Sequence, residues 1–236
     1  MARHLLLVLE APLLAFGGEA VDARGVIEDF PGASMLTGLL ANALGWRRGD
    51  RDALARLQAR LHYAARIDRN GTRMTDFQTA QLGHNDQGWT TRGAPEGRAG
   101  GAATYNGPHL RWRDYDADKR VVVALRMEPA EETPTLADLA TALDEPARPL
   151  FLGRKSCLPS GRVGAGIVEA DGLLPALAHL PQPDSKARVL LPANEPAESD
   201  DQLRPWSDRR DGHSGVHGGT RMVRIRVLRP SPESAA

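Results

Sequence analysis

The chain of 236 residues contains very little cysteine and no long apolar run. Cys157 is the single cysteine, which excludes a disulfide within the chain and a cysteine metal cluster and favours a reducing compartment. No apolar stretch approaches the ~20 residues of a membrane-spanning helix. The short apolar run after Arg3 is interrupted by Glu10, which indicates a buried first strand and not a signal peptide. We therefore expect a soluble, cytoplasmic protein with no membrane partner.

Lysine is scarce as well, because arginine supplies 27 of the 30 basic residues. The formal net charge is zero, which by itself points to no particular partner. The charges are nevertheless segregated: they are all acidic over residues 128–145, all basic over 148–162, and mostly basic over 204–229. A neutral chain can therefore carry a basic face that attracts an anionic polymer. Arginine also supplies the fork-shaped donors that suit phosphate.

Apolar spacing and turn signals predict alternating strands and helices over the first two thirds of the chain. Ser34 is expected to cap the first helix and Gly45 to end it, and Thr135 is expected to cap the helix that follows it. Asn70-Gly71 predicts a tight turn. The expected strands cover residues 5–9, 62–67, 121–125 and 149–152, and the expected helices cover 34–44, 51–61 and 135–143. With the second helix set aside, this is an α+β, ferredoxin-like βαββαβ order, as in RNA-recognition modules.

Residues 72–115 interrupt that order with a long segment rich in Gly, Thr, Gln, Asn and Arg and poor in aliphatic residues. A structureless segment of this length within a compact domain is usually functional or disordered. It carries Trp89, Arg92, Arg111, Trp112 and Arg113. Aromatic residues interleaved with arginines suit base stacking combined with phosphate pairing. Nucleic-acid binding and a disordered loop are the two open interpretations.

The last third of the chain is expected to be a smaller β-rich part. Residues 187–191 and 222–228 alternate like strands, and the segment between them is rich in Pro, Asp, Glu and Gly. We expect residues 1–155 to form the main unit, with an insertion at about 72–118, and residues 156–236 to form a subdomain packed on it.

A phosphate-binding site is expected where the apolar run 149–152 meets Gly153. The glycine frees the backbone to turn and would present Arg154 and Lys155 at the end of a rigid strand. Two solvated surface cations are the alternative, since charged residues are mostly exposed.

Motifs for catalysis and metal binding are absent or incomplete. There is no nucleotide-binding glycine loop and no Gly-x-Ser-x-Gly elbow. His213 and His217 are four residues apart, but the surrounding glycines disfavour a helix and no carboxylate cluster completes a site, so neither metal nor cofactor is expected. An RNA-cleaving acid–base pair has no supporting spacing. Its possible members are His62, His84, Tyr105, His109 and Lys119.

Five segments resemble, in the same order, those of one protein family. They are Leu9–Gly17, Phe30–Gly45, Thr75–Thr79, Arg111–Asp118 and Leu152–Cys157. The family is that of the CasD subunits of type I-E CRISPR Cascade complexes, which belong to the fifth Cas family of the RAMP superfamily. The resemblance covers roughly residues 4–160 and is loose over the last third.

The resemblance implies a ferredoxin-like palm with an inserted thumb. It implies a non-catalytic Cascade subunit that binds and caps the 5′ repeat-derived handle of crRNA and helps assemble the complex for antiviral and anti-plasmid DNA targeting. The implied partners are the large subunit, the backbone subunits and nearby target DNA. Together with the residue chemistry, it identifies as RNA-binding Phe16, Gly17, Gly18, Ser34, Trp89, Arg92, Arg111, Trp112, Arg113, Arg154 and Lys155.

Two other functions stay open. A sister branch of this family, in type I-C systems, cleaves RNA, so a metal-independent endoribonuclease that processes precursor crRNA is the alternative. A protein–protein adaptor with an incidental basic face is the third possibility. The chain also departs from the family pattern. Ala33 stands where relatives often carry a basic residue, and Asp116, Lys119 and Arg120 replace more apolar residues at the thumb's return.

Overall fold

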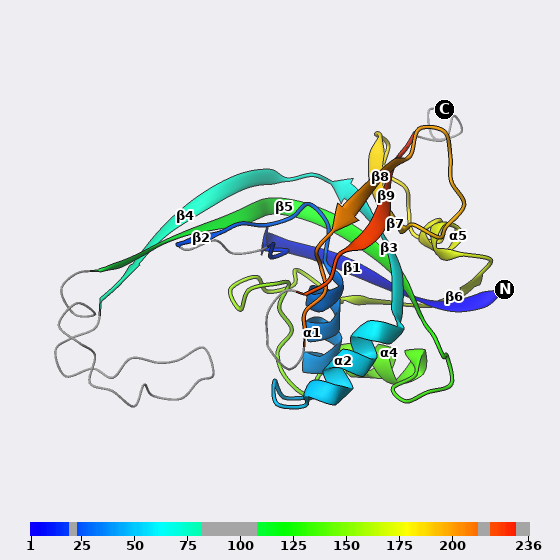
Figure 1. Ribbon diagram of the computed structural model, residues 1–236, viewed down its shortest axis with the longest axis horizontal. Helices are drawn as coiled ribbons and strands as arrows, with labels where there is room; N and C mark the ends of the chain where they lie inside the picture. The colour runs from blue at the N-terminus through cyan, green and yellow to red at the C-terminus, as the bar shows by residue number, and fades with distance from the viewer. Residues whose placement is uncertain (19–22, 82–107, 212–217, 230–236) are drawn as a thin grey trace.

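The computed structural model describes residues 1–18, 23–81, 108–211 and 218–229 (Figure 1). Several candidate residues lie outside these ranges, namely His84, Trp89, Arg92, Tyr105, His213 and His217. No helix among the described residues is both long enough and apolar enough to cross a membrane.

A single sheet forms the scaffold, with the strand order β6-β1-β5-β3-β7-β9-β8, and both β2 and β4 also pair with β5. All pairs are antiparallel except β2 with β5. The strands are β1 (Ala2–Leu14), β2 (Arg24–Gly25), β3 (Leu61–Arg69), β4 (Thr72–Ala80), β5 (His109–Met127), β6 (Gly164–Ala170), β7 (Ala187–Pro192), β8 (Gln202–Trp206) and β9 (Arg221–Leu228). The protein is therefore an α+β protein built on an open, mainly antiparallel sheet.

The helices cover the two faces of this sheet unequally. They are α1 (Ala33–Ala43), α2 (Arg51–Arg60), α4 (Leu136–Asp144) and α5 (Leu173–Leu177). Because side chains alternate along β1, Leu5 and Leu7 join the apolar core between the sheet and the helices α1 and α4, while Leu6 joins a smaller core with α5. Figure 1 shows α1, α2 and α4 gathered beneath the sheet.

The ends of the helices confirm part of the sequence prediction. Gly45, just beyond α1, has a left-handed φ of +81°, and Thr135 caps α4 in a capping box with Asp138. The prediction that Ser34 caps α1 is wrong. The cap is Gly32, which offers no side chain, and the N–H of Ala33 donates instead to a carboxylate supplied from the other end of the chain.

The strand predicted over residues 149–152 is also wrong, because that segment is irregular. The strand beside β1 is instead β6, whose Val168 lies opposite His4. The sequence did not predict β6 because the strand contains Gly164 and Gly166, and glycine is a poor strand former. Pro205 similarly hid β8, which is an edge strand where proline is tolerated.

The composition of the aliphatic-poor segment 72–115 favours irregular structure, but both ends of this segment are strands. β4 pairs with the first half of β5 from Thr72–Ala117 to Ala80–His109 in an unbroken register. This β4–β5 ribbon, residues 72–80 with 109–117, extends away from the helices (Figure 1). Nearly all of β4 is exposed, so the alternation of buried and exposed residues that marks a strand in sequence is missing.

Candidate nucleic-acid interface

Three chain segments meet at the base of the β4–β5 ribbon. β2 lies alongside β5, with Gly25 opposite Arg113 and the N–H of Trp112 donating to the carbonyl of Ala23 at 3.1 Å. After β2 the chain runs antiparallel alongside residues 16–18, and the N–H of Gly18 donates to the carbonyl of Val26 at 3.2 Å. The third segment is the loop 152–157, which follows the irregular run from residue 149.

The loop 152–157 is built tightly around Gly153. The N–H of Leu152 donates to the carbonyl of Cys157 at 2.7 Å, and the side chains of both residues are buried. Gly153 has a φ of +96°, and a Cβ there would lie 1.8 Å from the carbonyl oxygen of Ala15. Only glycine fits this position, so Gly153 does turn the chain as predicted, although no strand precedes it.

Arg154 leaves this loop and is held across the base of the ribbon. Its two terminal nitrogens donate to the carbonyls of Asp114 (2.7 Å) and Gly25 (2.8 Å). Its guanidinium carbon lies 4.7 Å from the centre of the Tyr115 ring. Because these partners are carbonyls and a ring, no carboxylate within the described ranges neutralises the Arg154 charge, and that charge has a fixed position.

Arg113 brings a second guanidinium to the same place. A Cβ built on Gly25 would lie 2.7 Å from Nη1 of Arg113 and 2.9 Å from Nη2 of Arg154, so both groups converge over this glycine. No ion pair joins either arginine to a carboxylate in the part of the chain that the structure describes. Asp76 lies opposite Arg113 in the ribbon, but no ion pair between them is formed. Two adjacent guanidiniums without an ion-pair partner among the described residues favour a bound anion such as phosphate. We call Gly25, Arg113 and Arg154 the arginine site, and the exposed Lys155 follows it directly.

The pairing of β4 with β5 separates the candidate residues onto two faces of the ribbon. Residues directly opposite share a face and successive residues alternate, so Arg111 and Arg113 lie on one face and Trp112 on the other. Phe77 lies opposite Trp112, with ring centres 5.2 Å apart, and is 53% exposed. Residue chemistry did not identify Phe77, although the alternation Thr75-x-Phe77-x-Thr79 could have indicated a strand with this face.

The remaining described candidates have different environments. The side chain of Phe16 is only 1% exposed, and Nζ of Lys119 lies 6.0 Å from its ring centre, so the ring belongs to the core and cannot stack on a base. Gly17 beside it is exposed. Ser34 lies in the first turn of α1, and its N–H donates to the Asp208 carbonyl at 2.9 Å. No hydrogen bond in the described structure links Ser34 to the arginine site.

The described groups proposed for RNA cleavage do not come together. His62 lies opposite Arg126 at one end of β5, whereas His109 begins the other end. Burial lowers the pKa of His62, although Nε2 lies 3.4 Å from the Glu128 carboxylate, which acts to raise it. Lys119 is buried and ion-paired, as described below. Among the described residues, no histidine is therefore placed to act with Lys119 as an acid–base pair.

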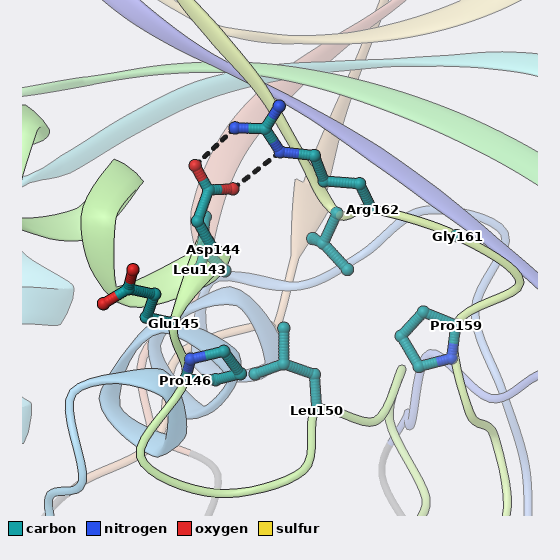
Figure 2. Close-up of a pocket in the computed structure, with 9 residues that line it drawn as sticks. Leu143, Asp144, Glu145, Pro146, Leu150, Pro159, Gly161 and Arg162 are labelled. Carbon is teal, nitrogen blue, oxygen red and sulfur yellow. Dashed lines mark hydrogen bonds and ion pairs between the residues drawn. The ribbon is translucent and has the colours of Figure 1, made fainter.

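A surface pocket of about 560 Å³ lies away from these residues, at the end of α4 (Figure 2). Its apolar walls include Leu143, Leu150 and Pro159. Figure 2 shows Arg162 on its rim reaching the Asp144 carboxylate through two hydrogen bonds, one of them 2.7 Å long. None of the candidate RNA-binding residues lines this pocket.

Comparison with known proteins agrees with this architecture. The family described as "CRISPR-associated protein (Cas_Cas5)" matches residues 4–224. The "CRISPR system Cascade subunit CasD" of Escherichia coli (strain K12) is 31% identical over 157 residues, which are 66% of this chain and 67% of that protein.

Two solved structures share the fold. A chain of a "CRISPR RNA-guided surveillance complex" has a TM-score of 0.66 and 22% identity, over 96% of this chain and 90% of that one. A chain described as "Crystal structure of Cas protein" has a TM-score of 0.65 and 26% identity, over 96% of this chain and 95% of that one. The fold and the matches define a CRISPR-associated protein. The chain belongs to the Cas5 family, and the resemblance to CasD is confirmed.

Proposed function

We propose that this chain is the type I-E Cascade subunit that binds and caps the 5′ repeat-derived handle of crRNA without cutting it. The arginine site carries the proposal: Arg113 and Arg154 converge over Gly25 without a described carboxylate partner, at the base of a protruding ribbon. Family membership supports the class of RNA, and the arginine site supports the place where its backbone binds.

Phosphate groups would bind at the arginine site, because guanidinium forks pair with phosphate oxygens in two parallel hydrogen bonds. Lys155, Arg111 and the exposed backbone at Gly17 extend that path. The Phe77–Trp112 pair offers a surface on which an unstacked base can lie. Because the arginines and the aromatic pair occupy opposite faces, an RNA strand that uses both must pass around an edge of the ribbon.

We also propose that the domains follow the palm-and-thumb plan. The neighbouring strands β6-β1-β5-β3, with helices after β1 and after β5, support a ferredoxin-like palm. The ribbon supports a thumb over about residues 72–118. Residues 156–236 add β7, β8 and β9 to the same sheet, and β6 serves as the fourth palm strand in place of 149–152.

The proposed partners are the large subunit and the backbone subunits of the complex, with target DNA nearby. The named relative from E. coli is itself described as a Cascade subunit, which supports an assembly role. No observation among the described residues favours the endoribonuclease alternative, since His62 on β3 lies beside one end of β5 and His109 lies at the other end. We therefore keep cleavage only as an outcome of the test.

The test is a gel-shift assay of the purified chain with labelled repeat RNA across a salt series, read for both binding and cleavage. Arg113→Ala and Arg154→Ala are each expected to weaken binding by about tenfold and to reduce the salt slope by about 0.7. Arg162→Ala is the control, because it removes an exposed arginine that is already paired with Asp144.

Two different results of this assay would each indicate another function. Cleavage at one position of the RNA would establish the endoribonuclease. Affinity that is insensitive to salt and unchanged by both arginine substitutions would indicate a protein–protein adaptor whose basic face is incidental.

A further inference from the structure

Both strands of the β4–β5 ribbon bend where the ribbon begins, and β1 still pairs with β5 as far as Asp116. Gly71, just before β4, has a φ of +67°, and Asp118, within β5, has a φ of +55°. The two residues flank the pair Thr72–Ala117, so the strands bend at the same level. A left-handed non-glycine residue is uncommon and costs backbone energy unless its surroundings enforce it. The positive φ values at the same level of both strands mark the place where the direction of the ribbon is set.

A cluster of five charged side chains spans this bend. Asp29 accepts hydrogen bonds from Arg73 of β4 at 3.1 Å and from Arg188 of β7 at 2.8 Å. Arg73 also donates to Asp116 of β5 at 2.9 Å. The buried Lys119 lies 2.6 Å from Asp116 and 4.0 Å from Asp29. We call these residues the root cluster, and it joins the ribbon to a strand of the sheet that does not pair with the ribbon.

Asp29 connects the ribbon to β7, because its carboxylate binds both Arg73 and Arg188. Burial acts to raise the pKa of its carboxyl, but the hydrogen bond and charge of Arg188, with the charges of Lys119 and Arg73, outweigh burial and lower it. The carboxylate therefore stays ionised. Without its charge, Arg188 would lose its carboxylate partner in the cluster and would repel Arg73 and Lys119, which Asp116 alone would then neutralise.

The same chain segment also supports the arginine site. Gly25, over which Arg113 and Arg154 converge, lies four residues before Asp29, and the intervening Ile27 accepts a hydrogen bond from Arg73 at 3.3 Å. Arg154 starts from the loop 152–157, but its guanidinium is held by Asp114 and Tyr115 of β5, next to Arg113. A change in ribbon angle would move these three β5 residues relative to Gly25 and the loop, and so would alter how the two guanidiniums lie over Gly25.

We propose that Asp29 is a positioning residue that holds the ribbon at one angle about the bend at Gly71 and Asp118. The role in RNA binding rests on the proposed function, whereas the effect on ribbon angle does not. A surface ion-pair cluster that only adds stability would leave the angle unchanged when Asp29 is neutralised.

The first experiment measures the ribbon angle in the full chain without RNA. Spin labels at Thr79→Cys on the ribbon and Ala59→Cys on α2 report their separation by double electron–electron resonance, and the native Cys157 is buried. The unsubstituted protein is expected to give one narrow peak in the distance distribution. In Asp29→Asn this peak should be replaced by a broad distribution. The same narrow peak in Asp29→Asn would overturn the proposal.

Two further variants sharpen this result. Asp118→Asn is the matched control: it neutralises a 79% exposed carboxylate that binds Arg69 at the same bend, and asparagine tolerates a positive φ. It should keep the narrow peak. Arg188→Gln removes only the ion pair between Asp29 and β7 and should broaden the distribution of spin-label distances. This variant keeps the proposal testable if Asp29→Asn folds poorly. A narrow peak in Arg188→Gln would count against it.

The second experiment measures binding of labelled repeat RNA. Removing a negative charge should by itself tighten RNA binding, whereas a displaced ribbon should weaken it by about three- to tenfold. Weaker binding by Asp29→Asn, restored by Asp29→Glu, supports positioning, and tighter binding refutes it. If the unsubstituted chain binds no RNA, the proposed function fails, while the distance measurement still decides the role of Asp29.

Discussion

The carboxylate of Asp208 accepts a hydrogen bond from the backbone N–H of Ala33 at 2.9 Å and so caps α1 from 175 residues away in the chain. The same carboxylate accepts a hydrogen bond from the Tyr63 hydroxyl at 2.8 Å and pairs with Arg221 at 2.7 Å. One buried group therefore joins the first helix, a central strand and the last strand of the sheet.

Asp208→Asn should destabilise the protein by about 3 kcal/mol. It weakens the cap of α1 and leaves the mostly buried Arg221 without its ion-pair partner, which is costly in a site of low polarity. Urea unfolding followed by circular dichroism measures the change in the free energy of unfolding. Asp184→Asn, on the exposed surface, is the control and should change it by less than about 0.5 kcal/mol. A similar small change in Asp208→Asn would show that this network is not coupled to stability.

Gly153→Ala should cost at least about 2 kcal/mol of stability, because the methyl group would collide with the Ala15 carbonyl and the left-handed backbone disfavours alanine. Thermal melting is the simplest measurement. Gly161→Ala is the matched control, since a Cβ there meets no atom within 4 Å and its φ is not in the left-handed range. Equal melting temperatures for the two variants would contradict the described loop.

Gly25→Ala should weaken the binding of handle RNA while leaving folding almost intact. Its methyl group would displace the guanidiniums of Arg113 and Arg154 and weaken the hydrogen bond from Arg154 to the Gly25 carbonyl, while the backbone can stay in place. We expect affinity to fall by about tenfold and the free energy of unfolding to change by less than about 1 kcal/mol. Filter binding with repeat RNA measures the first, and Gly38→Ala, on an open helix surface, is the control. Unchanged affinity would place the phosphate elsewhere.

The ion pair of Asp201 with Arg226 should make stability depend on acid. Hydrogen bonding from Arg226 lowers the pKa of Asp201 from 3.8 to about 2. The unfolded chain therefore binds this proton first as pH falls, so the stabilisation is complete above about pH 4 and is lost toward pH 2.

Asp201→Asn should accordingly cost about 1 kcal/mol at pH 7, a value reduced by solvent screening, and progressively less below pH 4. Urea unfolding of both proteins between pH 3 and pH 7 tests this sign. A difference that stays constant across that range would mean that Asp201 is not coupled to Arg226.

Local signals predicted the elements that depend on a few neighbouring residues. The strand over residues 121–125 and the Thr135 cap rest on contacts within a few positions, and both are present. The tight turn predicted at Asn70-Gly71 is wrong: β3 and β4 pair with consecutive stretches of β5, so the chain bends there and continues in the same direction. The Ser34 cap failed because a distant residue, Asp208, occupies that role. β4 was missed because nearly all of its residues are exposed, so no burial pattern marks it in the sequence.

The family, the central strands and the individual arginines at 113 and 154 can be predicted from residue order and local chemistry. That the two guanidiniums meet follows from long-range pairing, because the parallel pairing of β2 with β5 places Gly25 beneath both. Long-range packing also buries Phe16 in the core, and strand register turns Trp112 away from Arg113. Strand register and long-range pairing set which side chains share a face, and no short stretch of sequence contains that information.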